Sequence, residues 1–338
     1  MPDKIKVAIN WASACGGCDV ALLDVEEKIL DLVAVADVVY WPVAMDFKRE
    51  HLEAYGPKEI DVGIFNGAIR TNEHEEDALI LRDRCKVLIA YGACSCFGGI
   101  PGLANLHHRD AIFDCVYQDT PSTDNPDGNR PQTETMVNGR QLELPEFSAT
   151  TRALNQVVPV DYFLPGCPPT MDRVIDAVKV IIGFANTGEL PPPGTVIASA
   201  KALCDECPRS ATRTGKRISS LVRPHQVLAD PEICFIEQGI LCSGIATRGG
   251  CGASCINVNM PCRGCYGPTA EMLDPAAEAL STIGSIVAHE HEDELPRHKR
   301  VAPLKSIEDL CGTFYRFTLP SAVVFRKVED GKKYGHSP

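Results

Sequence analysis

The sequence predicts an α/β fold: a doubly wound parallel sheet in the N-terminal half, followed by an irregular domain rich in cysteine. Residues 1–188 alternate nearly continuous apolar segments with amphipathic stretches, which is typical of a parallel sheet covered by helices on both faces. Residues 200–265 lose this periodicity and contain eight of the sixteen cysteines. A chain of 338 residues is long enough for two domains. We expect these domains at 1–188 and 195–338.

The N-terminal elements follow one another in the order that a doubly wound sheet requires. Strands are expected at 4–10, 36–43, 60–67, 86–93 and 160–166, and helices at 19–33, 73–84 and 170–186. A polar insertion near 117–150, rich in Pro, Asn, Asp and Thr, predicts a loop. The stretch GELPPPG predicts a linker at 188–194. Beyond it we expect a helix within 268–287 and a terminal strand or extended arm at 314–325.

Composition and charge exclude several classes of function. The formal net charge of −12 makes nucleic acid and anionic lipid poor candidates for partners. The N-terminus carries no secretion signal, and no apolar run reaches the ~18 residues of a spanning helix. We therefore expect a reducing cytoplasm, where many cysteines indicate metal ligands rather than disulfides.

Four cysteines follow the ends of expected strands. Cys15 and Cys18 form a C-x-x-C directly after the first strand, and Cys94 and Cys167 each follow a later one. The carboxyl ends of parallel strands lie along one edge of a sheet, so we expect these four thiols to meet. Four thiolates suit zinc or a 4Fe–4S cluster. Because only one C-x-x-C pair is local, the spacing favours iron–sulfur over zinc.

The second half of the chain contains eight further cysteines, namely Cys204, Cys207, Cys234, Cys242, Cys251, Cys255, Cys262 and Cys265. A zinc ribbon made from the two C-x-x-C pairs would leave the four intervening cysteines unused. A radical S-adenosylmethionine motif fails because position 258 is Val. Two 4Fe–4S clusters in a ferredoxin-like wrap use all eight thiols. Four cysteines remain without a role: Cys85, Cys96, Cys115 and Cys311.

Twelve cysteines in three sets predict an electron conduit rather than a complete catalyst. A cluster held by four thiolates can pass electrons, but it leaves no position for an organic substrate. The chain also lacks a P-loop, a G-x-G-x-x-G fingerprint and a convincing Ser–His–Asp set. We therefore expect three 4Fe–4S clusters as cofactors and no catalytic residue in this chain.

Together, these motifs resemble the small subunit of nickel–iron hydrogenases over roughly residues 1–265. The resemblance rests on the first C-x-x-C, on G-x-C-x-x-x-G-G from Gly92, on P-G-C-P-P at 165–169, and on GGCGASC and MPCRGC. It is nearest to the cytoplasmic group 3 branch of methyl-viologen-reducing type, which does not reduce deazaflavin and is associated with heterodisulfide reductase. The stretch IFNGAIRTNEHEE, with Asn66–Gly67, looks like that branch.

The resemblance implies a flavodoxin-like N-terminal domain and a role for each cysteine set. The proximal 4Fe–4S cluster would be held by Cys15, Cys18, Cys94 and Cys167. The medial 4Fe–4S cluster would be held by Cys251, Cys255, Cys262 and Cys265. The distal 4Fe–4S cluster would be held by Cys204, Cys207, Cys234 and Cys242. Ligation by cysteine alone favours low reduction potentials.

The resemblance also implies the activity and the partners. The chain would be the electron-transfer subunit of a hydrogenase whose nickel–iron site lies in a separate large subunit. Electrons would pass to a small iron–sulfur subunit and then to heterodisulfide reductase, an assignment compatible with electron bifurcation to ferredoxin. The alternatives are the small subunit of a deazaflavin- or NAD-reducing hydrogenase, and a complex I-like electron-transfer subunit without nickel.

Overall fold

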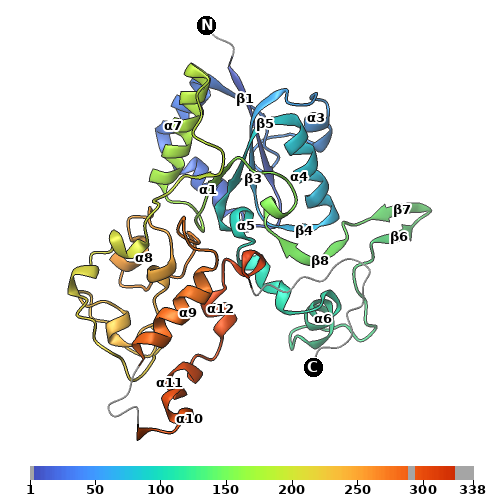
Figure 1. The fold of residues 1–338 in the computed structure, drawn as a ribbon. Helices are drawn as coiled ribbons and strands as arrows, with labels where there is room; N and C mark the ends of the chain where they lie inside the picture. The colour runs from blue at the N-terminus through green and yellow to red at the C-terminus, as the bar shows by residue number, and fades with distance from the viewer. Residues whose placement is uncertain (1–3, 288–293, 324–338) are drawn as a thin grey trace.

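The computed structural model describes residues 4–287 and 294–323. Its centre is a six-stranded parallel sheet in the order β10-β9-β5-β3-β1-β2 (Figure 1). The strands are β1 (Ile5–Trp11), β2 (Ala36–Tyr40), β3 (Ile60–Asn66), β5 (Cys85–Tyr91), β9 (Tyr162–Leu164) and β10 (Thr195–Val196). The strand order reverses beside β1, which creates a switch point between β1 and β3. The predicted doubly wound parallel sheet is therefore confirmed.

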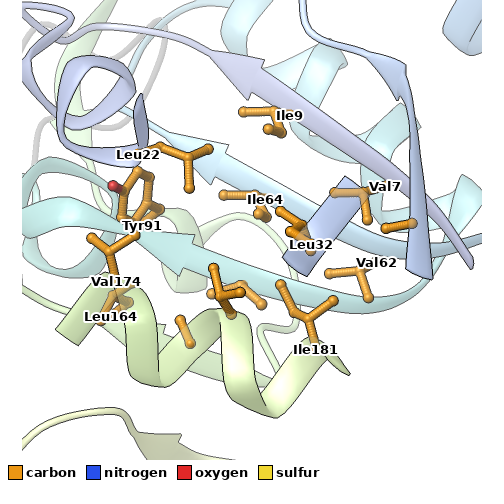
Figure 2. Packing of buried hydrophobic residues seen from close by; sticks show 14 of the residues in the cluster. Val7, Ile9, Leu22, Leu32, Val62, Ile64, Tyr91, Leu164, Val174 and Ile181 are labelled. Carbon is orange, nitrogen blue, oxygen red and sulfur yellow. The ribbon is translucent and has the colours of Figure 1, made fainter. Parts of the chain in front are cut away.

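Helices cover both faces of this sheet. Helices α1 (Gly17–Leu23), α2 (Ile29–Val35) and α7 (Met171–Thr187) cover one face, and α3 (Arg49–Glu53), α4 (Asn72–Arg84) and α5 (Gly92–Phe97) the other. Side chains of β1 alternate between the two cores, with Val7 and Ile9 on one face and Ala8 on the other. Figure 2 shows Val174 and Ile181 of α7 packed toward the apolar strands.

The helix expected at 19–33 is wrong as a single element. Helix α1 ends at Leu23, a 3₁₀ turn follows at Glu26–Lys28, and α2 begins at Ile29. Glu26 has a φ of 55°, in the left-handed region that a right-handed helix cannot include. The apolar periodicity runs across this break because Val25 is buried in the same core as Leu22 and Leu32.

The loop expected at 117–150 is correct only between a π-helical turn at Cys115–Asp119 and residue Glu134. After helix α6 (Arg109–Asp114), the chain forms a hairpin of β6 (Glu134–Val137) and β7 (Arg140–Glu143), which projects from the body (Figure 1). Its two-residue turn is Asn138–Gly139, with φ values of 51° and 76°. Both residues thus have the positive φ that the tightest hairpin turns need. Strand β8 (Phe147–Arg152) then pairs antiparallel with β4 (Ile69–Thr71).

The C-terminal half contains short helices connected by turns: α8 (Ser254–Asn257), α9 (Pro275–Ile286), α10 (Arg297–Arg300), α11 (Ala302–Lys305) and α12 (Leu310–Phe314). The helix expected within 268–287 is confirmed as α9. Strand β10 follows the predicted linker and still belongs to the N-terminal sheet. The division of the chain at 188–195 stays a prediction.

The strand expected at 314–325 is wrong for the described part of that segment. After α12 the chain makes a 3₁₀ turn at Leu319–Ser321. Pro320 fills the space above Gly98 and Gly102, where an added Cβ would overlap its ring. The Pro320 carbonyl also accepts a hydrogen bond from Gln156 Nε2 at 2.7 Å. The segment thus packs against the loop that follows α5. It is held by side-chain packing and a hydrogen bond rather than by pairing with a strand.

Candidate functional site

The first cysteine set gathers at the carboxyl edge of the sheet, as the strand order requires. Cys15 and Cys18 follow β1, Cys94 lies in α5 directly after β5, and Cys167 follows β9. Burial raises the pKa of Cys18, and the neighbouring thiols of Cys94 and Cys167 raise it further. Burial likewise raises the pKa of Cys94 to about 12, with Cys167 and Cys15 adding to the rise. The four thiols therefore lie within electrostatic reach of one another.

Two glycines allow the backbone to approach these sulfurs. A Cβ on Gly99 would lie 2.5 Å from Cys94 Sγ, and a Cβ on Gly92 would overlap Cys18 Sγ. Both glycines also have positive φ, at 56° and 83°. Only glycine satisfies the backbone angle and the close approach together.

Asp19 anchors the turn that carries the first two thiols. Its carboxylate is 4% exposed and accepts hydrogen bonds from Trp41 Nε1 at 2.9 Å and from Asn66 Nδ2 at 2.5 Å. The Tyr91 hydroxyl donates to the Cys18 carbonyl at 2.8 Å. Asn66 is fully buried, so its side chain positions Asp19 inside the chain and is not available to a partner subunit.

The set Cys204, Cys207, Cys234 and Cys242 lines a single cavity. A Cβ on Gly244 would lie 3.6 Å from Cys242 Sγ and 3.7 Å from Cys204 Sγ, which places these two sulfurs around one point. Burial raises the pKa of Cys204 to about 12, and Cys242 adds to the rise. Arg209 and Arg213 line the same cavity. Neither arginine was expected at a site from the sequence, although both lie within six residues of Cys207.

The thiols of the third set, Cys251, Cys255, Cys262 and Cys265, raise one another's pKa and so lie near one another. Burial raises the pKa of Cys265 to about 12, and Cys251 and Cys255 contribute to the rise. Burial also raises the pKa of Cys262, with Cys242 and Cys265 adding to it. Backbone amides of Ala253 and of Ser254, the first residue of α8, hydrogen-bond to the Cys251 thiol and oppose the effect of burial.

Direct contacts join this last set to the other two. The backbone amide of Cys167 hydrogen-bonds to the Cys265 thiol, and the amide of Cys262 hydrogen-bonds to the Cys242 thiol. Glu206, between Cys204 and Cys207, accepts from the Gly250 amide at 2.9 Å. The set that ends at Cys265 therefore adjoins both of the other sets and connects them.

The four cysteines without a predicted role have different surroundings. Cys85 is buried against Gly63, where a Cβ would lie 2.7 Å from its sulfur. Cys96 is buried, and its thiol lies 3.3 Å from the Ala90 carbonyl. Cys115 is exposed and Cys311 is partly exposed. None of the sixteen cysteines, all of which lie in the described residues, forms a disulfide.

The chemistry of the three donor sets fits iron–sulfur clusters. Thiols bind metal as thiolates, and several thiolates buried together repel one another unless positive charge lies among them. The irons of a cluster held by four thiolates would supply that charge. In the described residues, no three Cys, His, Asp or Glu side chains are grouped around one point as ligands of a single ion. The assignment of each thiol to a cluster stays a prediction.

An apolar cavity lies between the sheet and helices α1, α2 and α7. It has a volume of about 550 Å³, and apolar side chains line almost all of it. None of the described cysteines lines it, so it offers no ligand for a cluster.

The chain is similar to known proteins along almost its whole length. The sequence model of the family "NADH ubiquinone oxidoreductase, 20 Kd subunit" matches residues 15–181. The F420-non-reducing hydrogenase iron-sulfur subunit of Archaeoglobus profundus is 38% identical over 96% of this chain and 99% of its own length. The corresponding F420-non-reducing hydrogenase subunit of Methanothermobacter marburgensis is 35% identical over 98% of this chain and 100% of its own.

A solved structure supports the fold alone. It is a chain of the recombinant [NiFeSe] hydrogenase from Desulfovibrio vulgaris Hildenborough. The likeness covers 80% of this chain and 95% of that chain, with a TM-score of 0.50 and 17% sequence identity.

Proposed function

Because this chain belongs to the family of F420-non-reducing hydrogenase iron–sulfur subunits, we propose that it carries electrons from dihydrogen oxidation at a partner's nickel–iron site through three 4Fe–4S clusters. It is thus a subunit of an oxidoreductase whose catalytic metal lies in another chain. The observation that carries the proposal is the presence of three adjoining four-thiol sets, joined at Cys167–Cys265 and at Cys242–Cys262.

The clusters, when bound, supply one-electron redox centres, and the chain's own residues hold them in sequence. Cys15, Cys18, Cys94 and Cys167 would ligate the proximal cluster, Cys251, Cys255, Cys262 and Cys265 the medial one, and Cys204, Cys207, Cys234 and Cys242 the distal one. The amides of Cys167 and Cys262 each donate to a thiol of the adjacent set. These bonds stabilise thiolates and fix the spacing between neighbouring sites.

The surface around the proximal set suits an obligate partner. Cys15 and Cys167 are exposed. Large apolar side chains are exposed at the end of β1, in α1 and at the start of α7, the segments next to these cysteines, namely Trp11, Val20, Leu23 and Met171. Exposed apolar side chains beside a functional site are typical of a protein interface. We propose that the nickel–iron large subunit covers this surface and brings its metal site close to the proximal thiols.

The distal site is where electrons would leave this chain. We infer that a small iron–sulfur subunit accepts electrons at the distal site and passes them to heterodisulfide reductase, where bifurcation to ferredoxin can follow. In the alternative, a deazaflavin- or NAD-reducing hydrogenase, the same three sites would pass electrons to a different partner subunit. The complex I-like alternative accounts for less, because that family matches only residues 15–181 and eight of the twelve cysteines lie beyond them.

We also propose that the complex works in the cytoplasm, where thiols remain reduced. No helix in the described ranges is both long enough and apolar enough to span a bilayer.

Anaerobic purification of this chain with its natural partners tests the proposed function. The expected result is a larger partner that contains nickel, together with reduction of methyl viologen by dihydrogen. The Cys15→Ala variant should lose the proximal cluster and this activity. A complex without nickel, or a Cys15→Ala variant with unchanged turnover, contradicts the proposal.

A further inference from the structure

The cavity lined by Cys204, Cys207, Cys234 and Cys242 contains a buried arginine. Arg209 is 4% exposed, and it lines the cavity beside the four thiols. Its guanidinium donates to the carbonyls of Asp230 at 3.0 Å and Ile233 at 3.2 Å, and to Asn259 Oδ1 at 2.7 Å. Its Cζ lies 4.0 Å from the centre of the Phe235 ring. The side chain is therefore held in place by several independent contacts.

None of these contacts neutralises the charge. Neither Arg209 nor Arg213 takes part in any ion pair of the described residues. An arginine stays charged in proteins, and burying a charge without a counter-ion is unfavourable. The cavity therefore contains positive charge that calls for an anionic occupant.

A cluster held by four thiolates meets that requirement. Such a cluster carries net negative charge, which grows by one unit when it takes up an electron. A nearby fixed cation stabilises the reduced form more than the oxidised form and so raises the reduction potential. Arg213 lines the same cavity and is the second fixed cation beside these four thiols.

The surroundings of the other two sets differ. Buried Asp19 directly follows the proximal ligand Cys18. Glu206 Oε1 lies 3.8 Å from Cys251 Sγ in the middle set. Glu206 lies between Cys204 and Cys207 in sequence, but its carboxylate is directed to the middle set and does not line the distal cavity, where two arginines do.

We propose that Arg209 and Arg213 are the counter-charge of the distal cluster and give it the highest reduction potential of the three. This inference rests on the proposed function, since it requires the cluster to be present. It gives the chain a direction, because transfer of an electron from the medial cluster to the distal cluster, next to the exit, lowers the free energy. Both arginines are positioning residues that act through the field in the cavity.

Redox titration of the anaerobic complex, followed by electron paramagnetic resonance, tests the inference. The distal signal is identified as the one lost in Cys234→Ser. In the wild type it should have the highest midpoint potential of the three. Arg209→Met should lower that midpoint by about 59 mV, a tenfold change in the one-electron equilibrium. Arg213→Gln should shift the equilibrium about threefold in the same direction, and Arg213→Lys should shift it less.

Lys216→Gln is the matched control, since it removes a charge from the same exposed segment at a residue that does not line the cavity. Its distal midpoint should stay within error of the wild type. If Arg209→Met fails to assemble, the exposed Arg213 still decides the outcome. An unchanged distal midpoint in Arg213→Gln, or an equal shift of all three signals, overturns the inference while the proposed function stands. Absence of clusters from the wild type overturns both.

Discussion

The hydroxyl of Tyr266 accepts a hydrogen bond from the backbone amide of Thr170 at 3.0 Å and lies 3.2 Å from the Thr170 hydroxyl. Tyr266 follows Cys265, and Thr170 caps helix α7 three residues after Cys167. This contact therefore holds together the two loops that carry the proximal and medial thiols. It lies beside the hydrogen bond from the Cys167 amide to the Cys265 thiol.

Tyr266→Phe should loosen this junction. The variant leaves the Thr170 amide without its acceptor, which costs about 1–3 kcal/mol when the group is buried. Hydrogen exchange should become faster in the loop from Cys167 to Thr170, while the iron content stays unchanged. Tyr162→Phe is the control, because the Tyr162 hydroxyl donates to the Pro191 carbonyl in the linker instead. Equal exchange rates in this loop for wild type and Tyr266→Phe would show that the contact is not needed.

Cys94 and Cys96 offer a matched pair within one helix. Cys94 lies among the proximal thiols, whereas the Cys96 thiol lies against the Ala90 carbonyl. Cys94→Ala should lose about four irons and the activity that depends on the proximal site. Cys96→Ala should retain both, at a modest cost in stability. Iron analysis together with dihydrogen oxidation separates the two variants, and loss of iron from Cys96→Ala alone would reverse the assignment.

Gly92→Ala should damage the proximal site selectively. The new methyl group would overlap Cys18 Sγ, and the backbone has a φ of 83° that alanine adopts poorly. Spectroscopy should show loss of the proximal signal with the other two retained. Gly183→Ala in α7 is the control, since nothing lies within 4 Å of its added Cβ. Intact proximal signal in Gly92→Ala would mean that Cys18 can move without losing its function.

Asp77 should make the folded state less stable as the pH rises. Burial raises the pKa of Asp77 to about 6, and Arg49 nearby opposes the rise. In the unfolded chain the carboxyl ionises near pH ~4. Between these values the folded state binds a proton that the unfolded state has released, so stability falls as pH rises from about 4 to about 6. Above pH 6 the full penalty remains, up to roughly 3 kcal/mol.

Asp77→Asn removes this penalty, because the amide cannot ionise. Thermal unfolding of the anaerobic complex should show the variant to be more stable than wild type at pH 8, by a smaller margin at pH 5. Asp46→Asn, at an exposed position, should show no such difference. An equal margin at both pH values would refute the role given to Asp77.

The sequence predicted five of the six strands of the central sheet, and it placed the first four cysteines at the carboxyl edge of that sheet; strand β10 (Thr195–Val196) was missed because it is only two residues long and follows a proline-rich linker. Buried parallel strands produce apolar runs, and the geometry of a parallel sheet brings their following loops together. The hairpin could have been found from Asn138–Gly139, a strong turn signal that the polar composition of the insertion obscured. The break at Glu26 could not, because the apolar pattern continues through Val25 across it.

Arg209 could not have been predicted from sequence either. A lone arginine in a polar segment is normally solvated, and only tertiary packing shows that this one is buried without a carboxylate. The same holds for the contact of Tyr266 with Thr170, which joins residues far apart in the chain.

Native mass spectrometry of this chain, released anaerobically from its complex, tests the central claim most directly. The account predicts a mass increase equal to three 4Fe–4S clusters, hence about twelve irons and as many sulfides on twelve cysteines. Bound zinc in place of iron, or a mass equal to that of the bare polypeptide, would contradict it.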